Sequence, residues 1–383
     1  MRASVKAIVM QGPYQLSLNE FPYPKILNNS ALIKVELAGI CGTDKHMYKG
    51  EIIHPRGIPA NFPIIPGHEV VGVIENIGKE AKKEMGTLGE TLNEGDRVVV
   101  IPALYCKKCF YCKNYYGISF CEHYQGHYGW GLTCKDPPHL FGGWSEYLYA
   151  LPGSFLAKVP FEIPPEVAVL TEPFTVPYMV FNKAMHPYSL VKEGFSPGDS
   201  VVIQGSGPIG LAHLIFAKII GAGQIIVIGR PKYRLEIAKK YGATSVINID
   251  EVTDPQDRVE EVLKLTDKRG ADIVIEATGY PEAVNEGLEM LRILGTYIIV
   301  GLYIDMGEIR LNPQRKIVSK WAHVIGIPGQ TYQSYAAVLK IFKQYRKKIP
   351  FEEMITHVYK LEEAKEAMNK ALSEECMKVV FKP

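Results

Sequence analysis

Four cysteines lie within one sixteen-residue stretch of the chain. Cys106, Cys109 and Cys112 are spaced three residues apart, and Cys121 follows them. Four thiolates fill every position around a tetrahedral Zn²⁺ ion, so a site of this kind leaves no room for substrate and is structural. Disulfides are the alternative, but they belong to oxidising compartments, and the chain holds seven cysteines, an odd number. The spacing therefore predicts a structural zinc.

A second group of possible zinc ligands is dispersed along the chain. It comprises Cys41, the adjacent pair His68 and Glu69, and Glu172. One thiolate, one imidazole and one or two carboxylates can hold zinc and leave a position for water or substrate. Because these residues are far apart in sequence, their spacing alone does not separate an open zinc site from a buried cysteine and a core histidine.

A glycine-rich motif follows the strand-like run at 201–204 and opens a helical segment. Its residues are Gly205, Gly207, Pro208, Ile209 and Gly210. In that setting the glycines let the backbone approach a pyrophosphate, and the start of the helix favours its negative charge. The motif predicts a dinucleotide site, and the alternative is a tight strand-to-helix turn without a ligand.

The next strand-like run ends at Ile228 and is followed by Gly229 and Arg230, with no carboxylate. Sites specific for NAD usually carry an acid here, which binds the adenosine ribose hydroxyls. Without that acid nothing repels a 2′-phosphate, and a guanidinium can bind one. The pattern favours NADP over NAD, although a surface arginine beside NAD held by other groups is also compatible with it.

The elements that must position these residues fall into two patterns. Residues 1 to about 160 hold short β-branched runs between glycine- and proline-rich turns, and the polar segment 78–95 is expected to be an exposed loop or a short helix. From Ser200, apolar strands alternate with helices, which predicts a doubly wound parallel sheet. We expect one domain at 1–175 and 326–383, and a dinucleotide-binding domain at 176–325.

Composition narrows the functional classes. Of 383 residues, 47% are hydrophobic and 22% are charged, as in ordinary globular proteins. A net charge of +2 gives no reason to expect nucleic acid or an anionic membrane as a partner. The apolar runs are too short to span a bilayer, and the N-terminal residues lack a secretion signal. These features predict a cytoplasmic protein.

Taken together, the motifs resemble those of the zinc-containing medium-chain alcohol and polyol dehydrogenases over nearly the whole chain. The matching segments are 39–44 with His46, 67–69, 95–98, the cysteine stretch, 142–147, 171–173, the glycine-rich motif, and 234–243. The resemblance implies a mostly β, GroES-like catalytic domain joined to a Rossmann domain. It also implies a homodimer or a homotetramer.

The resemblance also implies roles for individual residues. Cys41 and His68 are expected to bind a catalytic zinc, with Glu69 and Glu172 as carboxylates that complete or exchange in its coordination. Asp44 is expected to orient His68. The proton relay is expected to use Thr43 and His46, and Thr278 and Gly301 complete the residues expected to bind the cofactor. Glutamate at 172 resembles the sorbitol, threonine and glucose dehydrogenase branches.

The expected reaction is hydride transfer between an alcohol and NAD(P), with a secondary alcohol, polyol or sugar favoured and zinc as Lewis acid. A simple alcohol dehydrogenase is the first alternative, and a non-catalytic dinucleotide-binding protein on the same fold is the second. The aromatic segment 122–141 is expected either to shape the substrate pocket or a subunit contact, or to form a small core beside the cysteine stretch.

Overall fold

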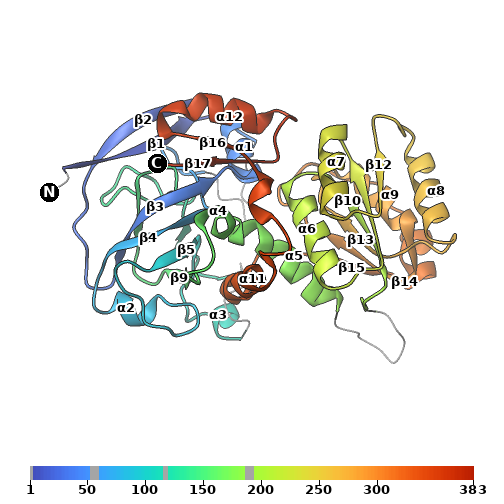
Figure 1. The fold of residues 1–383 in the computed structure, drawn as a ribbon, viewed down its shortest axis with the longest axis horizontal. Helices are drawn as coiled ribbons and strands as arrows, with labels where there is room; N and C mark the ends of the chain where they lie inside the picture. The colour runs from blue at the N-terminus through green and yellow to red at the C-terminus, as the bar shows by residue number, and fades with distance from the viewer. Residues whose placement is uncertain (1–2, 52–59, 115–119, 186–193) are drawn as a thin grey trace. The chain divides into compact units, whose positions relative to one another are not determined.

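The computed structural model describes residues 3–51, 60–114, 120–185 and 194–383. The chain forms two compact units (Figure 1). One unit combines Met1–Thr175 with Gly329–Pro383, and the other is Val176–Pro328.

The first unit is built on a seven-stranded sheet in the order β16-β17-β3-β4-β5-β9, with β8 also pairing with β3. The strands are β3 (Ala31–Gly39), β4 (Val70–Ile77), β5 (Arg97–Ile101), β8 (Tyr147–Ala150), β9 (Phe155–Lys158), β16 (Ile355–Tyr359) and β17 (Lys378–Phe381). The last strand of the chain lies antiparallel to β3, which brings the C-terminal segment beside the N-terminal strands (Figure 1).

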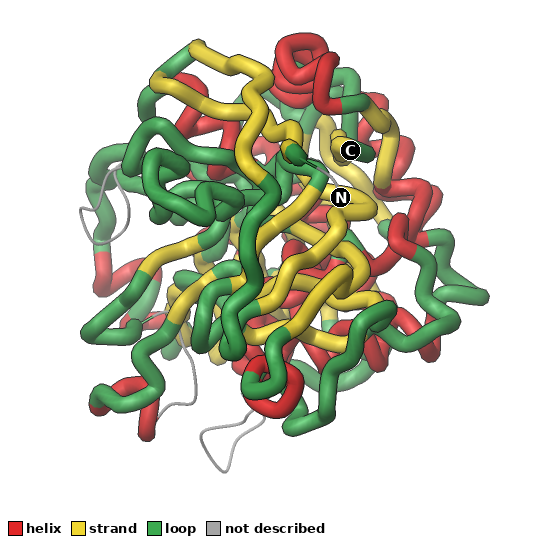
Figure 2. The backbone as a smooth tube through the Cα atoms, turned by 90° about the vertical axis from the view of Figure 1, so that its left-hand side faces the viewer, coloured by secondary structure: helices red, strands yellow, loops and turns green. Residues whose placement is uncertain are grey.

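Two smaller sheets and several helices complete this unit. The sheets pair β1 (Ser4–Gly12) with β2 (Gln15–Pro22) and β6 (Ala103–Leu104) with β7 (Gly126–His127). The helices are α1 (Gly42–Lys49), α2 (Ala81–Glu84), α3 (Phe110–Asn114), α4 (Pro165–Ala168), α11 (Tyr332–Tyr345), α12 (Ala364–Leu372) and the start of α5 (Thr171–Ala184). Strands and loops make up most of this unit (Figure 2).

The polar segment 78–95 contains the short helix α2 but is not simply exposed. Ala81, Met85 and Leu92 are each at most 2% exposed and belong to the hydrophobic core of the first unit. The prediction of an exposed segment was therefore wrong at these positions, because three apolar side chains at irregular spacing anchor it to the sheet.

The second unit is a six-stranded parallel sheet in the order β12-β11-β10-β13-β14-β15. Its strands are β10 (Ser200–Gln204), β11 (Gln224–Gly229), β12 (Ser245–Asn248), β13 (Ala271–Glu276), β14 (Leu291–Ile299) and β15 (His323–Gly326). Helices α6 (Pro208–Ile219) and α7 (Lys232–Tyr241) lie on one side of the sheet, and α8 (Pro255–Leu265) and α9 (Glu282–Met290) lie on the other (Figure 1). A short helix, α10 (Pro313–Lys316), precedes β15.

The order of the strands reverses between β10 and β13, so the carboxyl ends of these two strands form the topological switch point at which such sheets bind ligands. The predicted doubly wound sheet is confirmed. Among the described residues, no helix is both long and apolar enough to cross a membrane.

Candidate active site and metal centres

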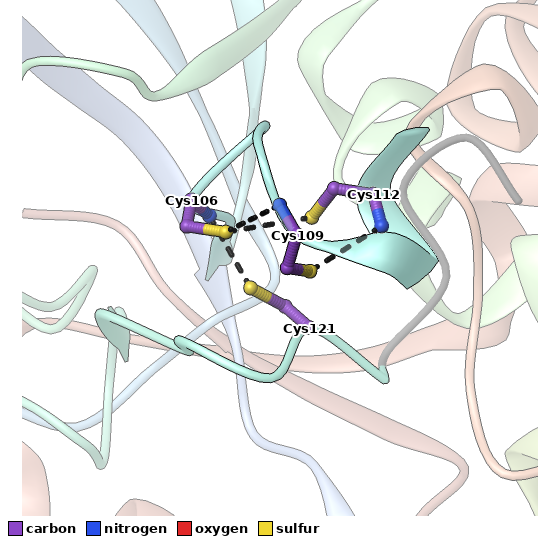
Figure 3. Close-up of side chains that lie close together, drawn as sticks. All are labelled: Cys106, Cys109, Cys112 and Cys121. Carbon is purple, nitrogen blue, oxygen red and sulfur yellow. Dashed lines mark hydrogen bonds between the residues drawn. The ribbon is translucent and has the colours of Figure 1, made fainter. Parts of the chain in front are cut away.

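The sulfur atoms of Cys106, Cys109, Cys112 and Cys121 all lie within 4.8 Å of one another (Figure 3). The Sγ atoms of Cys106 and Cys112 are 4.0 Å apart, and none of the four cysteines forms a disulfide. Four thiolates at about 2.3 Å from one zinc ion would be separated by about 3.8 Å. The arrangement therefore fits a tetrahedral zinc without rearrangement of the chain.

The local backbone explains why these thiols converge. The chain leaves β6, turns at Lys107 with a φ of +60°, and enters α3. Backbone N–H groups of Cys109 and Cys112 donate to the preceding cysteine sulfurs at 3.4 and 3.5 Å. Hydrogen bonds to its sulfur, the strongest from the Lys108 backbone, outweigh burial and lower the pKa of Cys106 to about 6, which favours the thiolate that binds metal.

A second cluster joins Cys41, His68 and Glu69, whose ligand atoms also lie within 4.8 Å of one another. Cys41 directly precedes α1, just beyond the end of β3, and His68 and Glu69 directly precede β4. The backbone N–H of Gly39 donates to the Glu69 carbonyl at 2.9 Å. A Cβ at Gly39 would lie 1.9 Å from Glu69 Oε2, so only glycine allows this approach.

Asp44 connects the two segments that carry these ligands. One carboxylate oxygen accepts from the Cys41 backbone N–H at 2.8 Å, and the other accepts from that of Gly67 at 3.4 Å. Its Oδ1 lies 3.9 Å from Nδ1 of His68, which is close enough for charge attraction but too far for a hydrogen bond. Burial opposes protonation of His68, yet the charges of Cys41 and Asp44 raise the pKa of His68 well above its usual value.

Lys378 on β17, which was not among the predicted site residues, also enters this cluster. Its ammonium group donates to Glu69 Oε1 at 2.5 Å and to the Ile40 carbonyl at 3.1 Å. Lys378 and Glu69 are 3% and 1% exposed, so this is a buried ion pair. Burial opposes the charge on Lys378, but Glu69 and Cys41 outweigh it and raise the pKa of Lys378.

Glu172 lies outside this tight group of three. It is buried in the first turn of α5, and its Oε1 accepts from the Gln330 side-chain amide at 2.6 Å. The same amide nitrogen lies 3.0 Å from the hydroxyl of Tyr335 on α11. Burial raises the pKa of Glu172, while the positive charge of His68 opposes that rise. Glu172 therefore lies beside the cluster and interacts electrostatically with His68.

The donor groups at this site suit a divalent cation. The sulfur of Cys41, the imidazole of His68 and the carboxyl group of Glu69 lie together, Glu172 lies beside them, and the ammonium of Lys378 is bound to Glu69. Uncompensated buried charge is costly, so a divalent ion would stabilise the arrangement. Sulfur, nitrogen and oxygen donors together are typical of zinc, and three protein ligands leave a position open.

Of the predicted relay residues, Thr43 and His46 lie on α1 and are partly buried. His46 Nδ1 is 2.7 Å from Oε2 of Glu51, a contact that the sequence did not reveal. The relay residues therefore lie on the same helix as Asp44, and this helix begins directly after the candidate metal ligand Cys41.

In the second unit, the predicted cofactor residues converge at the switch point. Gly205 has a φ of +114°, and a Cβ there would lie 2.6 Å from the Ala277 carbonyl oxygen. Gly207 and Pro208 begin α6, which leaves the first backbone N–H groups of the helix available to an anion. A Cβ at Gly301 would likewise lie 2.7 Å from the Thr278 nitrogen. The fit to a dinucleotide thus rests on close backbone approach at several points.

Gly229 and Arg230 lie beside the glycine-rich loop. The Ser206 hydroxyl donates to the Arg230 carbonyl at 2.7 Å, and a Cβ at Gly229 would lie 2.5 Å from that hydroxyl oxygen. The Arg230 guanidinium is about half exposed, with Nε 3.5 Å from Oδ1 of Asp250. An exposed guanidinium at this position is compatible with a 2′-phosphate.

Comparison with known proteins gives matches over most of the chain. Residues 28–161 match the alcohol dehydrogenase GroES-like domain, and residues 208–344 match the zinc-binding dehydrogenase domain. The chain is 31% identical over 385 residues to D-arabinitol dehydrogenase 1 of Uromyces fabae, covering 100% of this chain and 98% of that protein. The chain belongs to the zinc-containing medium-chain alcohol dehydrogenase family.

Other members of the family are similar in sequence and in structure. Sorbitol dehydrogenase of Bacillus subtilis is 32% identical over 395 residues, covering 99% of this chain and 98% of that protein. The crystal structure of an alcohol dehydrogenase from Thermotoga maritima superimposes with a TM-score of 0.88 at 30% identity, covering 99% of both chains. The predicted GroES-like and Rossmann fold is thereby confirmed.

Membership of this medium-chain dehydrogenase family makes the protein a zinc-dependent oxidoreductase that transfers hydride between an alcohol and a nicotinamide cofactor. The expected enzyme class is confirmed, and the alternative of a non-catalytic relative is not supported.

The aromatic segment 122–141 divides into two parts. Tyr124 packs against the cysteine cluster, and Tyr128 is fully buried in the core of the first unit, as expected for a small packing element. His127 instead packs edge-on against His68, with ring centroids 5.5 Å apart, and against Trp130 at 4.6 Å. Part of this segment therefore lies beside the candidate catalytic zinc ligand.

Proposed function

We propose that this dehydrogenase oxidises a polar secondary alcohol, such as a polyol or a sugar, and reduces the corresponding ketone. The observation that carries the proposal is the open cluster of Cys41, His68 and Glu69, with Glu172, Gln330 and Tyr335 beside it. A zinc ion bound there would lower the pKa of an alcohol hydroxyl and so favour its deprotonation. The first unit acts as the catalytic domain and the second unit as the dinucleotide-binding domain.

Residues of the chain supply the remaining chemistry. Asp44 keeps the segments of Cys41 and His68 together and attracts the imidazole. Thr43 and His46 accept and pass on the hydroxyl proton, and Glu51 holds His46 in orientation at 2.7 Å. In the second unit the glycine-rich loop binds the cofactor pyrophosphate, and Thr278 and Gly301 contact its other half.

The preference for a polar substrate rests on the neighbours of Glu172. The Gln330 amide and the Tyr335 hydroxyl are neutral donors and acceptors, and His127 and Trp130 add aromatic rings with polar atoms close to His68. Groups of this kind can bind further hydroxyls of a polyol while zinc binds one of them. The names of D-arabinitol and sorbitol dehydrogenase among the relatives support this substrate class.

A substrate panel tests the proposal. Steady-state kinetics with arabinitol, sorbitol, glucose, threonine, 2,3-butanediol, 2-butanol and ethanol should give the highest kcat/KM for a polyhydroxylated or otherwise polar alcohol. A clear preference for ethanol or 2-butanol would contradict it and favour a simple alcohol dehydrogenase. Cys41→Ala and His68→Ala should each abolish turnover while dinucleotide binding persists, and near-normal activity in either would mean that the catalytic zinc lies elsewhere.

We also propose two zinc ions per chain and a preference for NADP. Elemental analysis of metal-saturated protein should give a zinc stoichiometry near two, falling to near one in Cys109→Ser. The cofactor test uses Arg230→Ala, since any side chain at Gly229 would contact Ser206 and disturb the loop. This change should lower kcat/KM for NADP more than for NAD, and equal or better use of NAD by the unmodified protein would exclude the preference.

For assembly, we propose a homodimer formed through β15, one of the two edge strands of the sheet in the second unit. On β15 or shortly before it in the chain, Val318, Trp321 and Val324 are 61%, 70% and 41% exposed, which gathers three large apolar side chains near an unpaired strand edge. Trp321→Glu should shift the protein to a smaller mass in light scattering, and an unchanged mass would exclude this edge. The free thiols are in keeping with a reducing, cytoplasmic environment.

A further inference from the structure

Glu276 is a buried carboxylate at the carboxyl end of β13, the strand that adjoins β10 at the switch point. Its side chain is 0% exposed and accepts four hydrogen bonds. Oε1 accepts from the Thr278 N–H at 2.7 Å, the Thr278 hydroxyl at 2.8 Å and the Gly279 N–H at 2.7 Å, and Oε2 accepts from the Gly301 N–H at 2.9 Å. The carboxylate thus connects the loop after β13 to the end of β14.

The contacts around this carboxylate are too close to admit other side chains. A Cβ at Gly301 would lie 2.6 Å from Glu276 Oε1 and 2.5 Å from the Gly279 nitrogen. The loop after β13 contacts the glycine-rich loop in the same way, since a Cβ at Gly205 would lie 2.6 Å from the Ala277 carbonyl oxygen. Glu276 therefore lies beneath the backbone segments that are proposed to hold the dinucleotide.

The hydrogen bonds also fix the charge of this group. Each of its four contacts places a donor against a Glu276 oxygen, which is the pattern of an ionised carboxylate. In the described part of the chain no lysine or arginine forms an ion pair with it, so its charge is balanced only by N–H and O–H dipoles. A buried negative charge therefore remains close to the proposed cofactor site.

Two halves of a doubly wound sheet bind the two mononucleotides of a dinucleotide. The half that begins at β10 holds the pyrophosphate loop and, at the end of β11, the position that recognises the adenosine ribose, so the half that begins at β13 is left for the nicotinamide. The nicotinamide ring carries a positive charge when oxidised and none when reduced. On the basis of the proposed function, we infer that the negative charge of Glu276 favours binding of the oxidised cofactor over binding of the reduced one.

Binding measurements test this inference without turnover. The dissociation constants of NADPH and NADP⁺, and of NADH and NAD⁺, are measured on the zinc-loaded protein by nucleotide fluorescence and by competition. Glu276→Gln keeps the shape and removes the charge, and it should raise the ratio of the oxidised to the reduced dissociation constant by about threefold or more. Glu286→Gln is the matched control, because Glu286 pairs with Arg258 on α8 instead, and it should leave the ratio unchanged.

If Glu276→Gln weakens the binding of the oxidised and the reduced cofactor equally, the inference is overturned and Glu276 is a structural group. If Glu276→Gln does not fold, Thr278→Val decides, since it removes one donor that offsets the charge. That variant should lower the ratio of the oxidised to the reduced dissociation constant, and a constant or higher ratio would refute the inference. If the unmodified protein binds neither dinucleotide, the proposed function fails, and this inference fails with it.

Discussion

Replacement of Lys378 by methionine removes the cation that is buried against Glu69. Lys378 is 3% exposed, and its ammonium bonds to Glu69 and to the Ile40 carbonyl inside the first unit. Removing one partner of a buried ion pair leaves the other charge uncompensated and costs about 3–5 kcal/mol. Because Asp44 and Glu172 are acidic groups nearby, we expect the free energy of unfolding of the metal-free variant to fall by an amount within this range. For a unit of this size that corresponds to a loss in Tm on the order of 10 °C.

Zinc should reduce this loss. The ion supplies positive charge to the same carboxylate and thiolate, so it replaces part of what Lys378 provides. We expect the destabilisation by Lys378→Met to be at least about 1 kcal/mol smaller in zinc-saturated protein than after chelation. In other words, zinc should stabilise the variant more than it stabilises the unmodified protein. Thermal and denaturant unfolding of both proteins, with zinc and after chelation, measures the difference.

Lys6→Met is the matched control, since Lys6 pairs with Glu362 at 3.1 Å but both side chains are about half exposed. That pair should contribute about 0–1 kcal/mol, with no dependence on zinc. A loss in Lys378→Met no larger than that of the control would refute the account of the buried pair. An equal loss with and without zinc would show that the metal does not share the charge of Glu69.

Three further predictions concern the other parts of the molecule. Cys109→Ser should lower stability more than Cys41→Ser, because a structural zinc contributes directly to folding, and unfolding of the zinc-loaded variants compares them. Burial lowers the pKa of His213 from 6.5 to about 4. As the pH falls, His213 therefore binds a proton in the unfolded chain before it does so in the folded protein, and stability is lost between pH 6.5 and 4. Between pH 7 and 5 this costs about 2 kcal/mol, which His213→Leu should abolish in a comparison of denaturant unfolding at the two values. Gly301→Ala should weaken dinucleotide binding at least about tenfold in a fluorescence titration, because its Cβ would lie 2.5 Å from the Gly279 nitrogen and force the loop to move.

Short-range signals allowed much of the fold to be predicted. The sequence pattern predicts a helix from Lys232 to Tyr241, and α7 has these bounds. The glycine-rich motif begins α6 as expected. The sequence pattern also predicts a helix near Val259 to Thr266, but the helix observed there, α8, starts earlier, at Pro255. The missed signal was Asp254, whose side chain accepts from the Gln256 N–H at 2.8 Å, followed by proline at the first helical position.

The residues around the metal cluster were predictable only in part. Lys378 is 309 positions from Glu69, and Gln330 is 158 positions from Glu172, so no local spacing relates them. One signal was present, however. Lys378 begins the otherwise apolar strand β17 (Lys378–Phe381), and a lysine buried in such a strand needs an acidic partner. The partner itself depends on the pairing of β17 with β3, which only the three-dimensional structure shows.

The two candidate carboxylate ligands differ in what each must give up to bind zinc. Glu69 is closer to Cys41 and His68, but it is held by the ammonium of Lys378. Glu172 is held by the neutral amide of Gln330, and breaking that contact costs less than breaking a buried ion pair. Glu172 is therefore the carboxylate that we expect to exchange with water or substrate at the metal. Glu69 then stays paired with Lys378, and this pairing keeps the Glu69 carboxylate from occupying the open coordination position of the metal.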